Sequence, residues 1–303
     1  MWQQLYNEVR QGKIRSLSRC ISLVENEIAG YDSFLKSLPT ALQKITGITG
    51  PPGAGKSTLV DAIIKEWVSQ GKTVAILCID PSSPFNYGAL LGDRIRMSDW
   101  YTHPNVFIRS LSSRGSLGGL NPKVIEISEV LKVAGFDEIL IETVGVGQSE
   151  VEIAGLSDTT IVVLVPEAGD EVQTMKAGLM EIADIFVVNK SDRPDAAKFT
   201  KNLRMMLAPA FSTKKFEIPI IKTIASRYEG TSELISAIQQ HQQLNVIKER
   251  KNWLLTEKAW QLLQAKRMYP LNKKELHHHI EKSITNSQFN LYQFVADILK
   301  NGF

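Results

Sequence analysis

The stretch Gly47-Ile-Thr-Gly-Pro-Pro-Gly-Ala-Gly-Lys-Ser-Thr58 decides the fold of this chain. Within it, residues 50–57 follow the pattern G-x-x-x-x-G-K-[ST], between an apolar segment and a run with helical spacing. Strand, glycine loop and helix start form the context in which this pattern binds the phosphates of a nucleotide. We therefore predict a phosphate-binding loop rather than a glycine-rich turn that binds nothing.

Each residue type in this loop has a physical role in holding phosphate. Glycines let the backbone turn its N–H groups toward phosphate oxygens, and the following helix N-terminus attracts anions. The lysine reaches the outer phosphates and is expected to act in catalysis, and the hydroxyl after it can ligate Mg²⁺. The predicted nucleotide-binding residues of the loop are Gly50, Gly53, Ala54, Gly55, Lys56, Ser57 and Thr58.

The composition is that of an ordinary globular protein: 303 residues, 43% hydrophobic and 22% charged. A net charge of +3 with scattered basic residues gives no indication of a nucleic-acid surface. No apolar run approaches the length of a membrane span, and the N-terminus lacks the order of a secretory signal, so we expect a cytoplasmic protein. Cys20 and Cys78 give no disulfide framework, and Cys78 is predicted to be a buried core thiol.

Residues 45–230 alternate apolar runs with helical patterns. Most of these runs are continuously apolar, which is typical of parallel strands covered on both faces. We predict an α/β fold with a doubly wound, mostly parallel sheet and ligands at the carboxyl ends of its strands. The expected strands are 45–49, 73–79, 105–110, 138–142, 160–165, 185–189 and 218–224.

Helical patterns flank this region on both sides. We expect an N-terminal helical extension over 1–44, a nucleotide-binding domain over 45–245 and a C-terminal helical region over 246–303. The extension contains an apolar seam on a helix that ends near Gly30, formed by Ile14, Leu17, Ile21, Val24 and Ile28. A second short helix is expected within 33–42.

From Thr231 onward the sequence pattern becomes helical, with one stretch that runs to Leu263, across the boundary at 245, and is broken by Pro270. Two further helical patterns follow over 276–284 and 291–299. Their apolar faces are expected to pack on the core and on a second subunit. The triplet 277–279 consists of histidines that diverge around a helix, which favours a solvated face over a metal site.

The segment Asn189-Lys-Ser-Asp192 follows the apolar run 185–188 and fits the N-K-x-D loop that recognises guanine. The carboxylate of Asp192 can accept hydrogen bonds from N1–H and the exocyclic amine of guanine, a donor pair that adenine lacks. Asn189 would brace the loop, and the stem of Lys190 would cover the base. A simple turn is the competing interpretation, but the position at a strand end after a phosphate loop favours GTP over ATP.

Three carboxylates lie between these motifs: Asp80 and Glu142 at the ends of two predicted strands, and Asp93 in the segment Gly92-Asp-Arg-Ile-Arg-Met. Carboxylates at such strand ends hold Mg²⁺ and its waters, although a turn role competes for Asp80 and a cap or surface ion pair for Asp93. Glu142-x-x-Gly145 matches the place of a loop whose glycine N–H bonds the γ-phosphate. Gln148 is the candidate for positioning the attacking water. Asp93, Glu142 and Gln148 are therefore expected to act in catalysis with the loop lysine.

Taken together, these motifs resemble the MeaB/ArgK group of P-loop GTPases. That resemblance implies hydrolysis of GTP to GDP and phosphate with Mg²⁺, and a chaperone role toward an adenosylcobalamin-dependent acyl-CoA mutase, chiefly methylmalonyl-CoA mutase. It also implies a C-terminal dimerisation region, hence a homodimer, and a switch loop at 169–176. The segments that carry the resemblance are 50–58, Asp80-Pro-Ser-Ser, Leu91-Gly-Asp-Arg, Glu142-Thr-Val-Gly-Val-Gly-Gln-Ser-Glu150 and 189–192.

One departure concerns the base site. GTPases commonly place Ser-Ala after the last strand, where a backbone N–H meets guanine O6. This chain has Thr223-Ile-Ala-Ser226, so Ala225 and Ser226 are the expected contact residues. The chain also lacks an Asp-x-His-x-x-Gly cobalamin signature, which assigns that cofactor to the partner.

Two other functional classes stay open at this point. A nickel-insertion GTPase shares this core but needs a Cys/His cluster, and Cys20 and Cys78 each lack a close Cys or His partner. A transport-associated ATPase or kinase is the other class, and the segment 189–192 argues against it. An arginine finger supplied within the chain also stays open, with Arg94, Arg96 and Arg114 as candidates.

Overall fold

The computed structural model describes most of the chain: residues 1–80, 97–113, 120–143, 149–168, 177–211, 218–244, 249–268 and 273–284, with Leu291 and Val295. The chain divides into two compact units, residues 1–254 and 255–303. The first unit contains the nucleotide-binding motifs. The domain boundaries predicted at residues 44 and 245 stay predictions.

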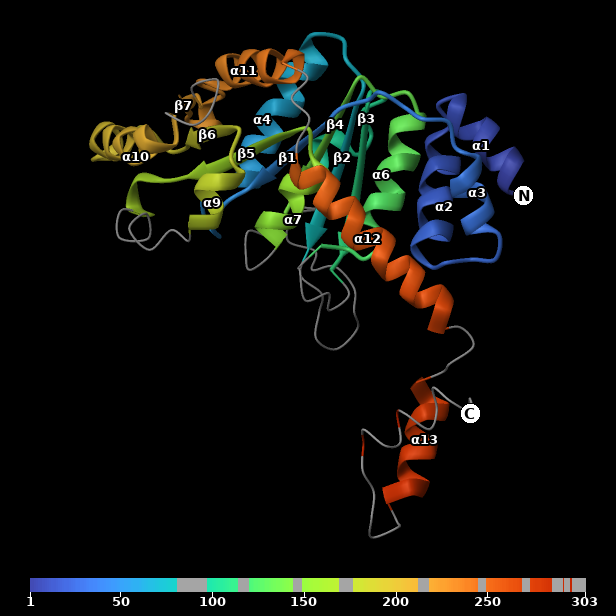
Figure 1. The fold of residues 1–303 in the computed structure, drawn as a ribbon. Coiled ribbons are helices and arrows are strands. Elements are labelled where there is room, and N and C mark those ends of the chain that lie inside the picture. The colour runs from blue at the N-terminus through green and yellow to red at the C-terminus, as the bar shows by residue number, and fades with distance from the viewer. Residues whose placement is uncertain are drawn as a thin grey trace. The chain divides into compact units, whose positions relative to one another are not determined.

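A seven-stranded sheet forms the centre of the first unit, with strand order β3-β2-β4-β1-β5-β6-β7 and parallel pairing throughout. The predicted doubly wound α/β fold is confirmed, and each predicted strand overlaps an observed one. Figure 1 shows β1 in the middle of the sheet, between β4 and β5. The strands are β1 (Ile45–Thr49), β2 (Val74–Asp80), β3 (Val106–Ser112), β4 (Glu138–Glu142), β5 (Thr159–Leu164), β6 (Ile185–Val188) and β7 (Ile220–Lys222).

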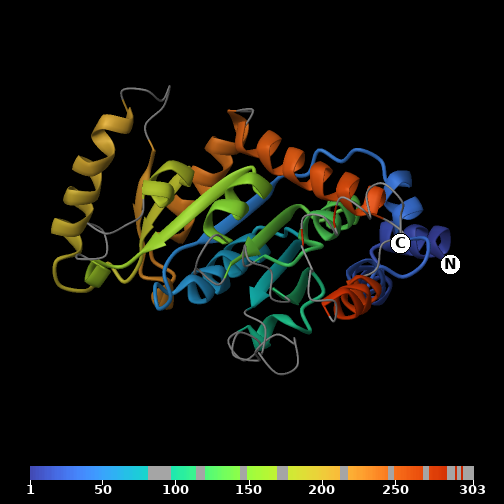
Figure 2. The same cartoon turned by 60° about the horizontal axis from the view of Figure 1, so that its bottom comes forward.

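Helices cover both faces of the sheet, which is why most of the strands are apolar without alternation. Successive β5 residues illustrate this: Val162 packs under α9 and α10, whereas Val163 packs under α4 and α11. Figures 1 and 2 show these helices around the sheet. One face carries α4 (Lys56–Ser69) and α11 (Thr231–Gln243), and the other carries α6 (Val124–Val133), α7 (Ser149–Leu156), α9 (Ala177–Ile182) and α10 (Ala196–Phe211).

Three N-terminal helices pack beside α6 and share its core: α1 (Trp2–Arg10), α2 (Ile14–Glu25) and α3 (Tyr31–Ser37). The middle of the predicted seam is buried, but Ile14 and Ile28 are 40% and 41% exposed. The predicted helix end near Gly30 is wrong by one turn, because α2 ends at Glu25 and Glu27 takes a positive φ of 52°. A left-handed residue there cannot continue a helix.

The C-terminal part of the chain is helical, as predicted, but the single stretch expected over 231–263 consists of two helices, α11 and α12 (Glu249–Met268). A third, α13 (Lys273–Ile284), carries the histidine triplet 277–279 on exposed positions. The predicted pattern over 291–299 falls almost entirely outside the described residues. No helix in the described ranges is long and apolar enough to cross a membrane.

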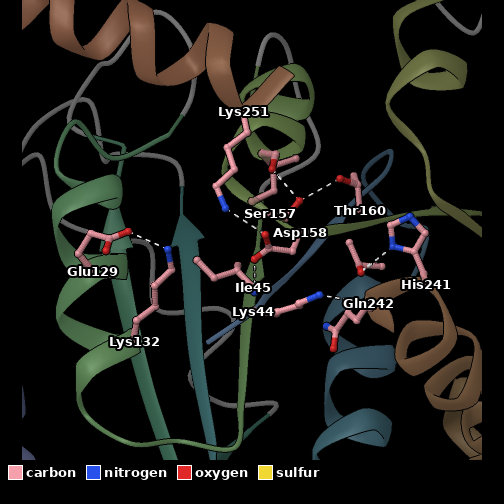
Figure 3. Close-up of polar contacts among 12 residues, drawn as sticks. Lys44, Ile45, Glu129, Lys132, Ser157, Asp158, Thr160, His241, Gln242 and Lys251 are labelled. Atoms are coloured by element: carbon pink, nitrogen blue, oxygen red, sulfur yellow. Dashed lines mark hydrogen bonds and ion pairs between the residues drawn. The ribbon is translucent and has the colours of Figure 1, made fainter. Parts of the chain in front are cut away.

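Polar contacts hold the amino ends of β1 and β5 together, and none of them was predicted from the sequence (Figure 3). Asp158 Oδ2 accepts from the Ile45 N–H at 2.8 Å, and Ile45 O accepts from the Asp158 N–H at 2.7 Å. Lys251 Nζ of α12 donates to Asp158 Oδ1 at 3.0 Å. Nearby, His241 Nδ1 of α11 lies 2.9 Å from the Thr159 hydroxyl. The strand that leads into the phosphate loop is therefore fixed at its start.

Candidate nucleotide-binding site

The loop after β1 depends on two glycines for its shape. Gly50 has φ 140°, and a Cβ there would lie 2.1 Å from Val163 O on β5. Gly55 has φ 84°, and a Cβ there would lie 2.5 Å from Asn189 Nδ2. Real Cβ atoms do not approach neighbours so closely, and positive φ disfavours side chains. The glycines therefore let the loop pass close to both β5 and the predicted base-binding segment.

The lysine of the motif folds back over this loop. Lys56 begins α4, is buried, and its Nζ donates to Gly50 O at 2.8 Å and to Pro51 O at 3.2 Å. Its positive charge is thus held inside the curve of the loop, where the helix N-terminus also attracts anions. This arrangement suits binding of a polyphosphate.

Ser57 and Glu142 come together although they lie far apart in the sequence. The Ser57 hydroxyl donates to Glu142 Oε1 at 2.8 Å, and the two residues are 6% and 4% exposed. Hydroxyl and carboxylate oxygens are the hard ligands that Mg²⁺ prefers. These oxygen ligands therefore fit a magnesium ion. Because β1 and β4 pair in parallel, both residues lie at the carboxyl ends of the strands.

A pair of hydroxyls that the sequence analysis missed sets the position of Glu142. Thr143 Oγ1 donates to Thr49 Oγ1 at 2.9 Å, and the Thr143 N–H donates to Ile48 O at 3.0 Å. Both threonines are buried. These bonds extend the β1–β4 pairing to the residue after Glu142. A threonine following a strand-end glutamate was the available signal, but it is too common to be specific.

Asn189 joins the phosphate loop to the segments after β6 and β7. Its Nδ2 donates to Ala54 O at 2.9 Å, and its Oδ1 accepts from the Thr223 hydroxyl and the Ala225 N–H, each at 3.1 Å. The side chain is 2% exposed, so these bonds form away from solvent. Because an amide has both donor and acceptor atoms, one residue can bridge three segments. The geometry matches the bracing role expected of Asn189.

Of the next residues of this motif, Lys190 and Ser191 are half-buried and Asp192 is exposed. Lys190 Nζ donates to Gly53 O at 2.8 Å, so its aliphatic stem extends from β6 to the phosphate loop. Lys190 also has a positive φ of 55°, which non-glycine residues adopt mainly where the surroundings require it. Asp192 is 38% exposed and forms an ion pair with Arg227. Its carboxylate is available to a ligand.

Ala225 and Ser226 are the two residues expected to contact guanine O6, and the N–H of Ala225 already donates to another group. Ala225 opens η3 (Ala225–Arg227), is buried, and donates its N–H to Asn189. Ser226 is exposed. Between these two residues, Ser226 is therefore the more accessible to a bound base.

Several predicted site residues fall outside the described ranges. These are Asp93, Gly145 and Gln148, together with the three arginines considered as fingers and the loop 169–176. Asp80 ends β2, so it lies with Glu142 at the carboxyl ends of the strands, but its side chain is not among the described ones. Thr58 lies in the first turn of α4 and is half-buried.

Comparison with known proteins identifies the family. The model of the family described as methylmalonyl Co-A mutase-associated GTPase MeaB matches residues 17–280. The chain belongs to the MeaB family. It is therefore a GTPase that binds guanine nucleotides, as the resemblance had indicated.

Two relatives show how far the similarity to MeaB proteins extends. A Pyrococcus abyssi protein with a provisional GTPase name is 48% identical over 248 residues, which are 80% of this chain and 76% of that protein. The mitochondrial methylmalonic aciduria type A homolog of mouse is 33% identical over 266 residues, 80% of this chain and 63% of that protein.

A solved structure supports the fold of this MeaB-family chain. The crystal structure of an LAO/AO transport system kinase superposes with a TM-score of 0.66 and 24% identity, over 100% of this chain and 93% of that one. At this identity the likeness concerns the fold alone. Membership of a GTPase family argues against the ATPase or kinase alternative.

Proposed function

We propose that the protein hydrolyses GTP as a switch that chaperones an adenosylcobalamin-dependent acyl-CoA mutase, with methylmalonyl-CoA mutase as the first client to test. The observation that carries this proposal is the family match over 17–280, because the family is described by its association with that mutase. The mouse relative bears the name of a methylmalonic aciduria protein, which agrees with this client. Cofactor loading and protection of the mutase would then depend on the nucleotide state.

In the proposed reaction, water attacks the γ-phosphate in line with the leaving GDP. Lys56 and the loop amides would neutralise the charge that develops on the phosphate oxygens. Ser57 and Glu142, already in contact at 2.8 Å, would hold Mg²⁺ with Asp80 and Asp93. An ion held by these residues would supply positive charge that helps to neutralise the phosphate oxygens in the transition state.

Guanine selection is proposed for the segment 189–192. Asp192 would accept from N1–H and the 2-amino group, and the Lys190 stem would cover the base. Asn189 would keep the loops after β6 and β7 at a fixed distance from the phosphate loop through its bond to Ala54 O. Replacing Asp192 by Asn would exchange one acceptor for a donor and shift the preference toward xanthosine triphosphate.

We also propose that the C-terminal region mediates a homodimer. On α12, Trp253, Trp260 and Leu263 are 71%, 58% and 58% exposed, and large apolar side chains gathered on one helix favour a protein partner. Replacing Trp260 and Leu263 by serine is expected to weaken dimerisation, and so is removing the residues after Pro270. Sedimentation velocity of the full, substituted and shortened chains measures this, and an unchanged dimer would contradict the role of that region.

The chaperone role is tested by binding to a purified mutase. The protein is loaded with GDP, with a non-hydrolysable GTP analogue or with no nucleotide, and mixed with methylmalonyl-CoA mutase in its apo and holo forms. We expect a complex whose affinity changes with nucleotide and with cobalamin occupancy, and faster GTP turnover in the complex. Absence of a complex in every nucleotide state would contradict this client, and stoichiometric nickel binding would favour the metallochaperone alternative.

A further inference from the structure

Asp192 meets a cation from the neighbouring loop. Arg227 Nη2 lies 3.7 Å from Asp192 Oδ2, and the two side chains are 62% and 38% exposed. Arg227 ends η3, which follows β7, whereas Asp192 follows β6. These two strands are neighbours at the end of the sheet. The ion pair therefore joins the two loops that flank the proposed base site.

The length of this contact determines what it can do. At 3.7 Å the pair is close enough for charge attraction but longer than the roughly 3.2 Å limit of an N–H···O hydrogen bond. Arg227 therefore stabilises the carboxylate without occupying its acceptor sites. A carboxylate has about four such sites, and the two donors of guanine need two of them. Arg227 and a guanine base can engage Asp192 together.

Arg227 itself is presented from a fixed backbone. The residue after it, Tyr228, has a positive φ of 62°, and Lys65 Nζ lies 3.6 Å from the centre of its ring. Lys65 belongs to α4, the helix that starts at the phosphate loop. Two residues before Arg227, the Ala225 N–H donates to Asn189. Both sides of η3 are thus tied to the nucleotide-binding core.

We propose that Arg227 is a positioning residue for base recognition: it holds the Asp192 carboxylate in the orientation that meets both guanine donors. The inference rests on the base-reading role proposed above for Asp192. Two parallel hydrogen bonds require a defined carboxylate plane, whereas one bond tolerates rotation. Hypoxanthine keeps N1–H but lacks the 2-amino group. Arg227 should therefore favour GTP over ITP.

The test compares steady-state hydrolysis of GTP and ITP by wild type and Arg227→Ala. We expect the KM for GTP to rise about threefold, the size of an exposed ion pair, with kcat unchanged. The KM for ITP should change little, so the preference for GTP falls by the same factor. Arg227→Lys should restore part of that preference. In about 1 M salt, which screens charges beyond roughly 3 Å, the difference between wild type and variant should shrink.

Two further variants make the result decisive. Arg15→Ala removes an exposed arginine on α2 with the same change in charge and should leave both KM values unchanged. Asp192→Asn separates the two proposals: a shift toward xanthosine triphosphate with no effect of Arg227→Ala would overturn the role of Arg227 alone. No shift in Asp192→Asn would overturn the base-reading role itself. An unchanged or lowered KM for GTP, or equal changes for GTP and ITP, would also overturn the role of Arg227.

Discussion

Asn189→Ala is the most informative single substitution, because one buried side chain joins three segments of the site. The change removes the bond to Ala54 O at 2.9 Å and those from Thr223 and Ala225 at 3.1 Å. Each such bond contributes about 1 kcal/mol, and stranding a buried polar group adds to the loss. We expect the free energy of unfolding to fall by about 3–4 kcal/mol, or roughly 10 °C in Tm for a domain of this size.

The same substitution should affect ligand binding, because it cuts the link between the phosphate loop and the base-binding loops. We expect GTP to bind at least about tenfold more weakly, which corresponds to about 1.4 kcal/mol. Urea unfolding gives the stability, and titration with a fluorescent GTP analogue gives the affinity. Asn202→Ala is the matched control, since Asn202 is exposed on α10.

A double-mutant cycle isolates one of these bonds. Thr223→Val removes the hydroxyl that donates to Asn189 and keeps the shape of the side chain, so about 1 kcal/mol of stability should be lost. Combined with Asn189→Ala it should cost little more than Asn189→Ala alone, because the partner is already absent. Additive losses, or a stability change below about 1 kcal/mol for Asn189→Ala, would refute the bridging role.

Three other substitutions probe separate parts of the molecule. Lys56→Ala should abolish GTP hydrolysis measured as phosphate release, and unchanged turnover would contradict the loop assignment. Asp158→Ala should lower the free energy of unfolding by about 1–2 kcal/mol, because the Ile45 N–H loses its acceptor, while the KM for GTP stays the same. Hydrogen bonds from the N–H and hydroxyl of Thr73 lower the pKa of Asp137, so its stabilisation is present above the unfolded value of about 3.9 and is lost as pH falls through the folded value. The Tm difference between wild type and Asp137→Asn should therefore be larger at neutral pH than at about pH 3, and a constant difference would refute this.

The sequence predicted the sheet well because its strands are buried on both faces. Runs such as 161–165 have no polar position, which leaves a parallel strand between two helix layers as the consistent interpretation. Helix ends were less predictable, since they depend on single residues. Ile28 fits the period of the seam, but the left-handed Glu27 ends the regular geometry before it. Periodicity reports which face is apolar and does not report where the backbone turns.

For the site, the motifs located the phosphate loop and the segment 189–192, but the contacts between segments came only from the fold. That Ser57 reaches Glu142 depends on β4 lying beside β1, an order that no local pattern encodes. Asp158 and Ile45 are likewise 113 positions apart, and an aspartate before a strand has no distinctive signal. Arg227 was also unpredictable as a partner of Asp192, because β6 and β7 had first to be placed side by side.

The position of β1 explains why one loop can serve as the anchor of the whole site. All five residues of β1 are buried. At its amino end, the Ile45 N–H donates to the Asp158 carboxylate and the Ile45 carbonyl accepts from the Asp158 N–H. Its carboxyl end leads into Gly50, whose backbone lies against Val163 of β5. The strand therefore cannot slide along its neighbours without breaking contacts at both ends. Because the phosphate loop is fixed in this way, the sheet holds Glu142 of β4 and Asn189, which follows β6, at constant positions relative to the loop.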